Sequence, residues 1–408
     1  MIKTLTSAFK NKDIRKKLLY TLMMLVVIRI GSLLPIPGVD TEYFSTLLSG
    51  FNSGDLSYLS AFTGGSFEKM SLFALSITPY ITSSIIMQLL TIAIPKLEEM
   101  QKEGEDGRKK IASITRYVTI ALALIESIAM AVGFGRQGLI KDYKDMSTIH
   151  YVTCIIVVVA ALTAGSAVLM WIGERITEKG VGNGISIVLL INIISGMPSD
   201  FVTLYSTFVA NKSIARGVTV AVIIAAIVIA VVVLVVILQD GERRIPVQYS
   251  QKVAGRKTIG GQATNIPLKV NTAGVMPIIF ASSIMQFPVI IVQLFTSNSY
   301  EWTKYLSQSY WCRVQMPKYS IGLLLYIILV VVFAYFYTSI TFNPVQIADN
   351  LKKAGGVVPG ITPGRSTSEY LNKILNYIVF IGAVGLMIVA LIPIMCTGFF
   401  NASVSFGG

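Results

Sequence analysis

The chain has 408 residues, of which 53% are hydrophobic and only 13% are charged, and its mean hydropathy is +0.69. Soluble globular domains average about 25% charged residues, so this composition excludes an ordinary soluble fold. The formal net charge is nevertheless +13 at neutral pH. Together these values predict an all-α polytopic membrane protein with basic segments outside the hydrocarbon core.

Nine segments are apolar over the roughly 20 residues that a helix needs to cross a bilayer. In chain order they are residues 18–35, 70–92, 114–134, 151–172, 184–206, 217–238, 272–295, 319–340 and 373–395. The lead segment MIKTLTSAFKNKDIRKKLLY has no small-residue cleavage site, so we expect the first span to be retained. The sequence stops at FFNASVSFGG after an odd number of spans, and we expect a tenth helix to be missing from it.

Lysine and arginine residues are unequally divided between the two sets of connecting segments. The set that includes the N-terminus carries 24 of them, and the opposite set carries 9. Short connections rich in lysine and arginine stay in the cytoplasm. The N-terminus is therefore predicted to be cytoplasmic.

The second and seventh spans contain similar decapeptides. PYITSSIIMQ begins at Pro79 and PIIFASSIMQ begins at Pro277, and six of their ten positions are identical. Each decapeptide lies in the second span of a half with five spans, so the halves would run in opposite directions. Inverted repeats of this kind place a transport pathway at the interface between the halves. The alternative is two unrelated apolar helices that each contain a proline.

The sequence offers little for catalysis. It has no GxxxxGK[ST] loop for nucleotide phosphates. His150, the single histidine, lies at the edge of the fourth span, where we expect an interfacial role, and the three cysteines have no CxxC spacing. We therefore expect no enzymatic activity, no cofactor and no bound metal.

Two ionisable residues stand out within the predicted spans, where a charge is costly. Arg29 is close enough to the end of the first span to reach the interface. Glu126, in LALIESIAMAV, is either a proton or ion site or a polar contact to a neighbouring helix or subunit. A proton or ion site would favour a secondary transporter of small solutes, which is the main alternative to a channel.

Branched aliphatic residues lie beside each proline or Gly-Asn-Gly break in the second, fifth and seventh spans. Such side chains around a constriction repel water and ions by dewetting and yield when something large passes. The alternative is that each residue simply packs against lipid or another helix. The residues are Ile77, Ile81, Ile185, Leu189 and Ile279.

Two connections on the cytoplasmic side, residues 239–271 and 341–372, are long, basic and rich in glycine and proline. Loops of this length in compact proteins are usually functional or disordered. Some of their charge is explained by topology and by contacts with lipid headgroups. The remainder suits a large anionic partner, either an acidic protein surface or the phosphates of ribosomal RNA.

Several segments resemble the SecY family of bacterial protein-conducting channels, and the resemblance covers essentially the whole chain. The segments are SLFALSITPYITSSIIMQLL, WIGERITEKGVGNGISIVLL, RIGSLLPIPGVD, GERRIPVQYSQ, IPLKVNTAGVMPIIFASSI and FNPVQIADNLKKAGGVVPGITPG. The resemblance implies a passive pore that moves secretory polypeptides across the bacterial plasma membrane and releases membrane segments laterally into the lipid. It also implies two inverted halves, here residues 1–206 and 207–408.

The resemblance assigns roles to particular residues. The five aliphatic residues above become the pore ring. A plug helix is expected at about 55–68, with Leu56, Leu59, Phe62, Gly64 and Gly65. A lateral gate between the second and seventh helices would include Ser84, Gln88, Ser282 and Gln286. The docking surface for SecA and the ribosome would carry Arg243, Arg244, Arg256, Lys352, Lys353 and Arg365.

The implied partners are the SecE and SecG subunits, the SecA motor ATPase, the ribosome, signal-bearing polypeptides and membrane lipids. Two positions depart from the family pattern. Ser76 stands where the family usually has glycine, and Thr362 stands where it usually has arginine in Gly-x-Arg-Pro-Gly. Arg365, three residues later, is the candidate substitute for SecA coupling, and an accessory paralogue is the alternative.

Overall fold

The computed structural model describes residues 10–50, 63–140, 147–206, 214–249, 252–254, 257–259, 264–295, 300–313 and 316–400. The helices of the first half are α2 (Lys12–Leu33), α3 (Thr41–Gly50), α5 (Thr78–Ala93), α6 (Pro95–Lys102), α7 (Glu105–Phe134), η1 (Gly135–Leu139), α8 (Thr148–Lys179) and α9 (Gly184–Leu204). The second half contains α10 (Ile214–Asp240), α11 (Met276–Phe295), α12 (Thr303–Leu306), η3 (Gln308–Tyr310), η4 (Pro317–Ser320), α13 (Ile321–Thr341), α14 (Pro344–Lys353) and α15 (Arg365–Phe400).

Each of the nine predicted spans overlaps one of these α-helices. Within the described part of the chain, six helices are long and apolar enough to cross a membrane. A seventh candidate is the pair α5 and α6, whose axes differ by 105°. The apolar stretch of α11 is shorter, over Met276–Val289. The architecture is therefore that of an all-α polytopic membrane protein.

The second predicted span begins later than expected. Residues 70–77 form turns, and α5 starts only at Thr78, so the prediction of a helix from Met70 is wrong. Met70 and Ser76 have φ values of 41° and 52°, which no right-handed helix contains. Pro79 then lies in the first turn of α5, where its missing N–H has no helical partner to lose. Pro79 therefore opens the helix and does not break it.

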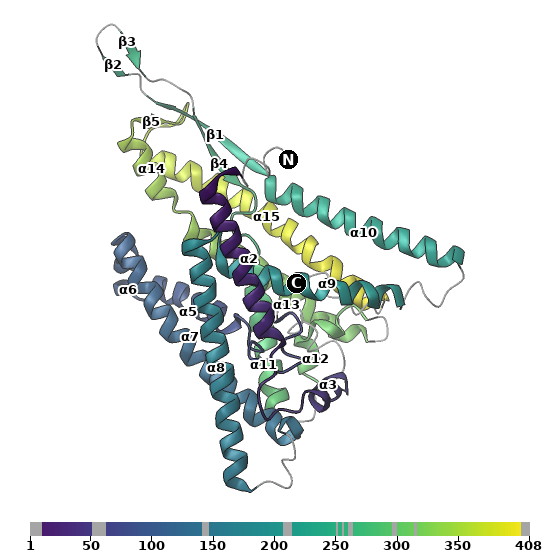
Figure 1. Cartoon of the computed structure of the whole chain (residues 1–408). Helices are drawn as coiled ribbons and strands as arrows, with labels where there is room; N and C mark the ends of the chain where they lie inside the picture. Colours follow the sequence, from purple (N-terminus) through teal and green to yellow (C-terminus); the bar gives the residue numbers. More distant parts are fainter. Residues whose placement is uncertain are drawn as a thin grey trace.

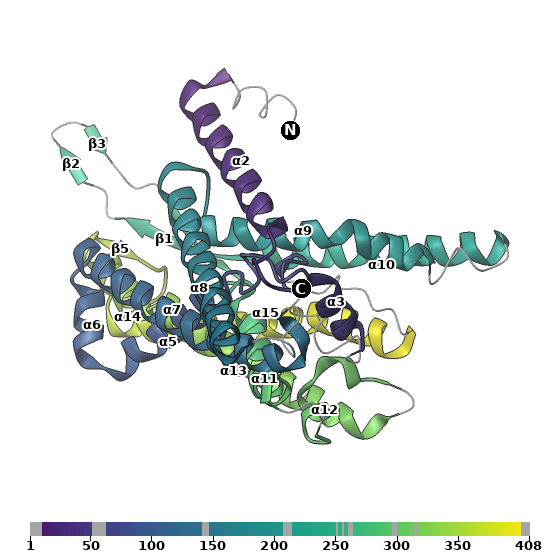
Figure 2. The same cartoon turned by 60° about the horizontal axis from the view of Figure 1, so that its bottom comes forward.

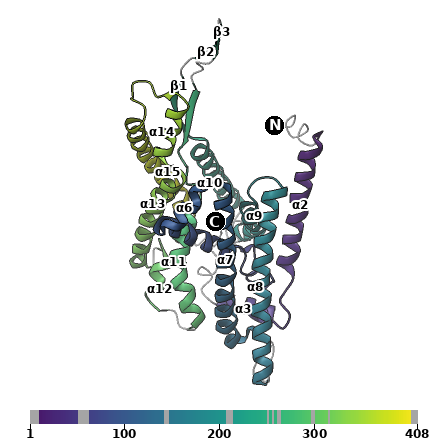
Figure 3. The same cartoon turned by 90° about the vertical axis from the view of Figure 1, so that its left-hand side faces the viewer.

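The molecule has two distinct ends along the direction of α2 and α8. The strands, α14 and the N-terminal end of α2 lie at one end, whereas α3 and α12 lie at the other (Figures 1 and 3). α10 extends away from the rest of the chain (Figure 2). None of the side chains in its apolar window, Val218–Asp240, is buried.

The predicted loop 239–271 contains β-strands among its described residues. β1 (Glu242–Tyr249) pairs antiparallel with β4 (Thr264–Lys269) and, at its far end, with β5 (Gly356–Val357). β2 (Lys252–Ala254) and β3 (Lys257–Ile259) form a hairpin beyond the sheet (Figure 1). The sheet buries Ile245, Val247 and Leu268 in a cluster that continues into α14 and α15.

Candidate functional site

The five aliphatic residues singled out from the sequence lie in one apolar cluster. Ile77, Ile81 and Ile279 are buried, with exposed fractions of 1%, 8% and 9%, and Ile185 and Leu189 pack against them half-buried. They come from the start of α5, from α9 and from α11. The structure thus brings together residues that are up to about two hundred positions apart in the sequence.

Local sequence fixes how α9 presents Ile185 and Leu189. Asn183 caps the helix, because its side-chain oxygen accepts hydrogen bonds from the backbone N–H groups of Ile185 and Ser186 at 3.0 and 3.4 Å. Gly184 lies against α8, where an added Cβ would come within 1.9 Å of the Gly173 carbonyl oxygen. The Gly-Asn-Gly break therefore starts α9 in close contact with α8.

Residues 63–77 form a segment of turns that lies between the cluster and the rest of the first half and is hydrogen-bonded on both sides. The backbone N–H of Leu72 donates to the carbonyl of Leu34 at 2.9 Å, and the N–H of Ile36 donates to Met70 at 3.1 Å. On the other side, the Asn192 side-chain amide of α9 donates to the Ser76 hydroxyl at 3.0 Å. We call residues 63–77 the turn segment.

The turn segment contains only part of the predicted plug. Leu56, Leu59 and Phe62 lie outside the described residues. Gly64 and Gly65 adopt φ values of 62° and 79°, the left-handed region that favours glycine. Gly64 lies against α9, whereas a Cβ at Gly65 would meet nothing within 4 Å.

The predicted gate residues lie on α5 and α11, and the pair on α5 is not hydrogen-bonded to the pair on α11 in the described part of the chain. Ser84 and Gln88 of α5 are half-buried, and Ser282 and Gln286 of α11 are buried. Among the residues that the structure describes, no hydrogen bond links the α5 pair to the α11 pair. Ser282 instead accepts a hydrogen bond from the Gln308 amide at 3.1 Å.

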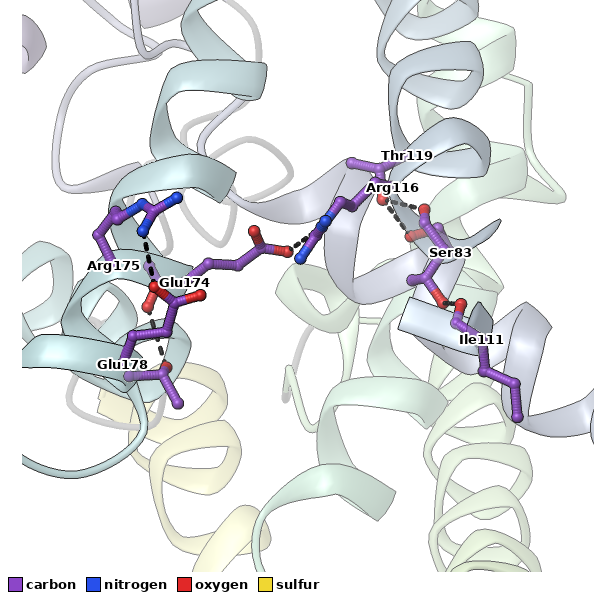
Figure 4. Close-up of polar contacts among 10 residues, drawn as sticks. Ser83, Ile111, Arg116, Thr119, Glu174, Arg175 and Glu178 are labelled. Atoms are coloured by element: carbon purple, nitrogen blue, oxygen red, sulfur yellow. Dashed lines mark hydrogen bonds and ion pairs between the residues drawn. The ribbon is translucent and has the colours of Figure 1, made fainter. Parts of the chain in front are cut away.

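Polar contacts that the sequence did not reveal tie α5 to its neighbours in the first half. The hydroxyls of Ser83 on α5 and Thr119 on α7 lie 2.5 Å apart, and Arg116 on α7 forms an ion pair with Glu174 on α8 at 2.6 Å (Figure 4). These side chains lie far apart in the sequence and follow no motif. Their only shared signal is that they are polar residues in or beside apolar runs.

The predicted docking residues that the structure describes are exposed and lie at the end of the molecule that carries the sheet. Arg243 and Arg244 occupy consecutive positions of β1, so their side chains leave opposite faces of the strand. Arg244 pairs with Glu242 at 2.6 Å, and Arg365, at the start of α15, pairs with Glu369 at 3.0 Å. Lys352 and Lys353 end α14, and Arg256 lies outside the described residues.

The remaining sequence candidates do not assemble into a second site. Glu126 is half-buried on α7 and forms no hydrogen bond or ion pair with the described residues. Arg29 lies on α2, and its Nη1 atom is buried without a hydrogen-bond partner among them. Thr362 is exposed, and its backbone carbonyl accepts a hydrogen bond from the Thr367 hydroxyl at 2.9 Å.

Solved channel structures have the same fold. The structure described as "The structure of a protein conducting channel" matches with a TM-score of 0.58 and covers 97% of this chain and 87% of the other, at 17% identity. A SecY structure, described as showing that the plug domain stabilises the closed state and maintains a membrane seal, matches with a TM-score of 0.60 at 18% identity. The chain thus has the fold of the protein-conducting channels.

Sequence comparison gives the family. A family model described as SecY matches residues 71–408. The chain is 41% identical to the protein translocase subunit SecY of Corynebacterium glutamicum over 395 residues, which cover 95% of this chain and 87% of that relative. Its identity to the corresponding subunit of Halalkalibacterium halodurans is 40%, covering 97% of this chain and 89% of that relative. The chain belongs to the SecY family, so it is a protein-conducting channel subunit of the Sec translocase and neither an enzyme nor a solute transporter.

Proposed function

We propose that secretory polypeptides cross the membrane through the centre of this bundle, and that the aliphatic cluster is its closed constriction. The observation that carries the proposal is the convergence of Ile77, Ile81, Ile185, Leu189 and Ile279 in one apolar cluster drawn from three helices. Branched aliphatic side chains disfavour water in a narrow passage, so ions are excluded at rest. The same side chains make no directional bonds, so they part for a polypeptide of any sequence.

The lateral gate lies between α5 and α11, and it releases apolar segments of the substrate into lipid. Two features support this. Pro79 and Pro277 are each the second residue of their helices, so the two repeated decapeptides open equivalent elements of two inverted halves. In addition, α5 and α11 both contribute to the aliphatic cluster without a hydrogen bond between their gate residues in the described part of the chain.

The protein lies in the bacterial plasma membrane with its N-terminus in the cytoplasm. The N-terminal end of α2 and the basic strands lie at the same end of the molecule, as the charge distribution predicts (Figures 1 and 3). That end docks the ribosome or the SecA motor, which supplies the energy. A relative at 18% identity is described as Sec61 in a ribosome-channel complex, which supports the ribosome as a partner.

SecE and SecG complete the channel as membrane subunits. The support for such partners is α10, which packs mainly against α15 and buries none of the side chains in its apolar window. An apolar helix whose side chains are left unburied by its own chain is covered either by lipid or by partner helices. Basic residues near the ends of the spans contact anionic lipid headgroups.

The ring is tested by the resting ion conductance of the channel in planar bilayers. Replacing Ile81 and Ile279 together with glycine is expected to raise the conductance severalfold, because the constriction loses two of its apolar walls. The matched control is the double replacement of Ile92 and Ile284 with glycine. These residues lie on the same two helices, with exposed fractions of 54% and 50%. Equal conductance in the two double variants would refute the ring assignment.

A further inference from the structure

Both ends of the turn segment meet one turn of α9. Near its start, an added Cβ at Gly64 would lie 2.6 Å from the Ser195 hydroxyl oxygen and 2.8 Å from the Asn192 carbonyl oxygen. Near its end, the Asn192 amide donates to the Ser76 hydroxyl at 3.0 Å. Asn192 and Ser76 are both buried, with exposed fractions of 3% and 1%. A single residue, Asn192, therefore contacts the segment at positions 64 and 76.

Ser76 occupies a backbone conformation that favours glycine. Its φ of 52° lies in the left-handed region, where a side chain is strained. A glycine at this position would relieve the strain but would have no hydroxyl for the Asn192 amide. Ser76 thus adopts a strained backbone conformation and forms a buried hydrogen bond to α9.

The same face of α9 carries the aliphatic cluster. Leu189 and Ile185 precede Asn192 by three and seven residues, the spacings that place side chains above one another on a helix. Ile77, another member of the cluster, directly follows Ser76. Movement of α9 away from the cluster would therefore move it away from both ends of the turn segment as well.

We propose that Asn192 and Ser76 form a clasp that holds the turn segment closed against α9 and makes its release depend on the widening of the aliphatic ring. Asn192 is a positioning residue: its side-chain amide acts on the segment through Ser76, and its backbone lies against Gly64. This inference rests on the proposed channel function, because only a channel needs to release the segment. The inference adds to that function a residue pair that couples the turn segment to the aliphatic ring in the closed channel.

The clasp is tested by the rate at which N-ethylmaleimide labels a cysteine at position 66 in membrane vesicles that contain the full chain. Ser66→Cys places the thiol at a buried position of the turn segment, with an exposed fraction of 1%. Cys154, Cys312 and Cys396 are replaced by alanine in every variant, so that only position 66 reports. Asn192→Leu keeps the side-chain volume and removes the amide donor. It should raise the labelling rate about fivefold, the change in open population that the loss of one buried hydrogen bond produces.

A double-mutant cycle separates the clasp from general loosening of α9. In a Ser76→Gly background the hydroxyl is already absent, so Asn192→Leu should change the labelling rate less than about twofold. An equal increase in both backgrounds, or no increase in either, would overturn the clasp. The readout is specific because a purely structural role of Asn192 would not depend on the residue at position 76.

The packing at Gly64 is tested with its neighbour as the control. Gly64→Ala and Gly65→Ala both place a side chain at a positive φ, but only the Gly64 substitution drives a methyl group into α9. Labelling at position 66 should therefore rise more for Gly64→Ala, and equal rates would contradict the close contact.

The ring variants and the clasp variants fail independently. If the ring variants raise conductance and Asn192→Leu leaves labelling unchanged, the clasp is wrong and the channel proposal stands. If labelling follows the cycle but the ring variants conduct no better than their control, the hydrogen bond from Asn192 to Ser76 still holds the turn segment, but the ring assignment fails and the coupling of release to the ring fails with it.

Discussion

At the scale of single residues, glycines determine how closely separate segments of this chain approach. Gly165 of α8 faces the carbonyl oxygen of Leu72 in the turn segment, and an added Cβ would lie only 1.8 Å from that oxygen. Gly31 of α2 likewise leaves room for the Phe73 ring, which an added Cβ would meet at 2.1 Å. The turn segment is thus enclosed by α2 and α8 as well as by α9.

Gly165→Ala is expected to destabilise the protein by about 1–3 kcal/mol, the usual cost of forcing extra volume into a packed interior. Gly196→Ala on α9 is the control, because an added Cβ there meets nothing within 4 Å. Alanine is the better helix former, so this change should be neutral or stabilising by up to about 1 kcal/mol. Thermal unfolding of the two purified variants measures the difference. A lower melting temperature for Gly196→Ala than for Gly165→Ala would contradict the packing described here.

At the scale of elements, the sheet determines which way the proposed docking surface faces. Ile245 and Val247 point from β1 into the cluster with α14 and α15, so that face of the sheet is covered. Alternation along the strand places Arg244 on the opposite, open face and Arg243 on the covered side, opposite Leu268 of β4. A large partner that docks on the open face meets Arg244 first.

Arg244→Glu is therefore expected to weaken binding of SecA or the ribosome more than Arg243→Glu does. The reversed charge would also stand beside Glu242, its present ion-pair partner, and so leave two acidic groups on the open face. Cosedimentation with vesicles at low and high ionic strength measures the effect, which should shrink as salt rises. Equal losses from both reversals, or binding that is insensitive to salt, would refute docking on this face.

Elements with a local signal were predictable from the sequence, and elements set by distant contacts were not. The apolar runs gave the positions of the nine helices because burial in lipid requires uninterrupted apolar residues. β1 was missed because its partners, β4 and β5, lie elsewhere in the chain and its own sequence includes two arginines and a proline. Residues 70–77 were misread as helix because they are apolar. Their turns follow from contacts with residues 34–36, α8 and α9.

The residues of the candidate site likewise divide into those that local sequence predicts and those that only the fold reveals. The ring residues could be chosen from the sequence because each lies next to a helix-starting proline or a Gly-Asn-Gly break. Asn192 was missed, although an asparagine within the apolar run VLLINIISG is a visible signal of a buried polar contact. Its partner, Ser76, was noted only as a departure from the family pattern. Pairing the two requires the fold, because 116 residues separate them.

At the scale of the whole molecule, the two halves meet where α11 packs against α7 and where α5 and α11 share the aliphatic cluster. The polar contacts from Ser83 to Thr119 and from Arg116 to Glu174 make α5 part of a block with α7 and α8. We expect the gate to open by movement of this block relative to α11, since the described residues contain no hydrogen bond between the two sets of gate residues.

A signal-bearing polypeptide stalled during translocation should crosslink to cysteines introduced at both Ser84 and Ser282, because these serines lie on the two helices of the gate. A cysteine at Ser199, on the exposed surface of α9, provides the control. The crosslinked products are detected on gels after the labelled chain has been cleaved, and their amounts are compared between positions. Products at Ser199 that equal those at the two gate positions would show that the substrate does not pass between α5 and α11.

The pairing of β1 with β5 closes a loop of roughly a hundred residues that contains α11 and α13. Residues 248–357 therefore form a loop closed by backbone pairing, where Gln248 meets Val357 and Tyr249 meets Gly356. A cut in the connection between α11 and α13, at the opposite end of the molecule, would leave both fragments joined through this pairing. Force that a docked motor applied to the hairpin of β2 and β3 would reach α14 through the same pairing, without first passing through a membrane helix.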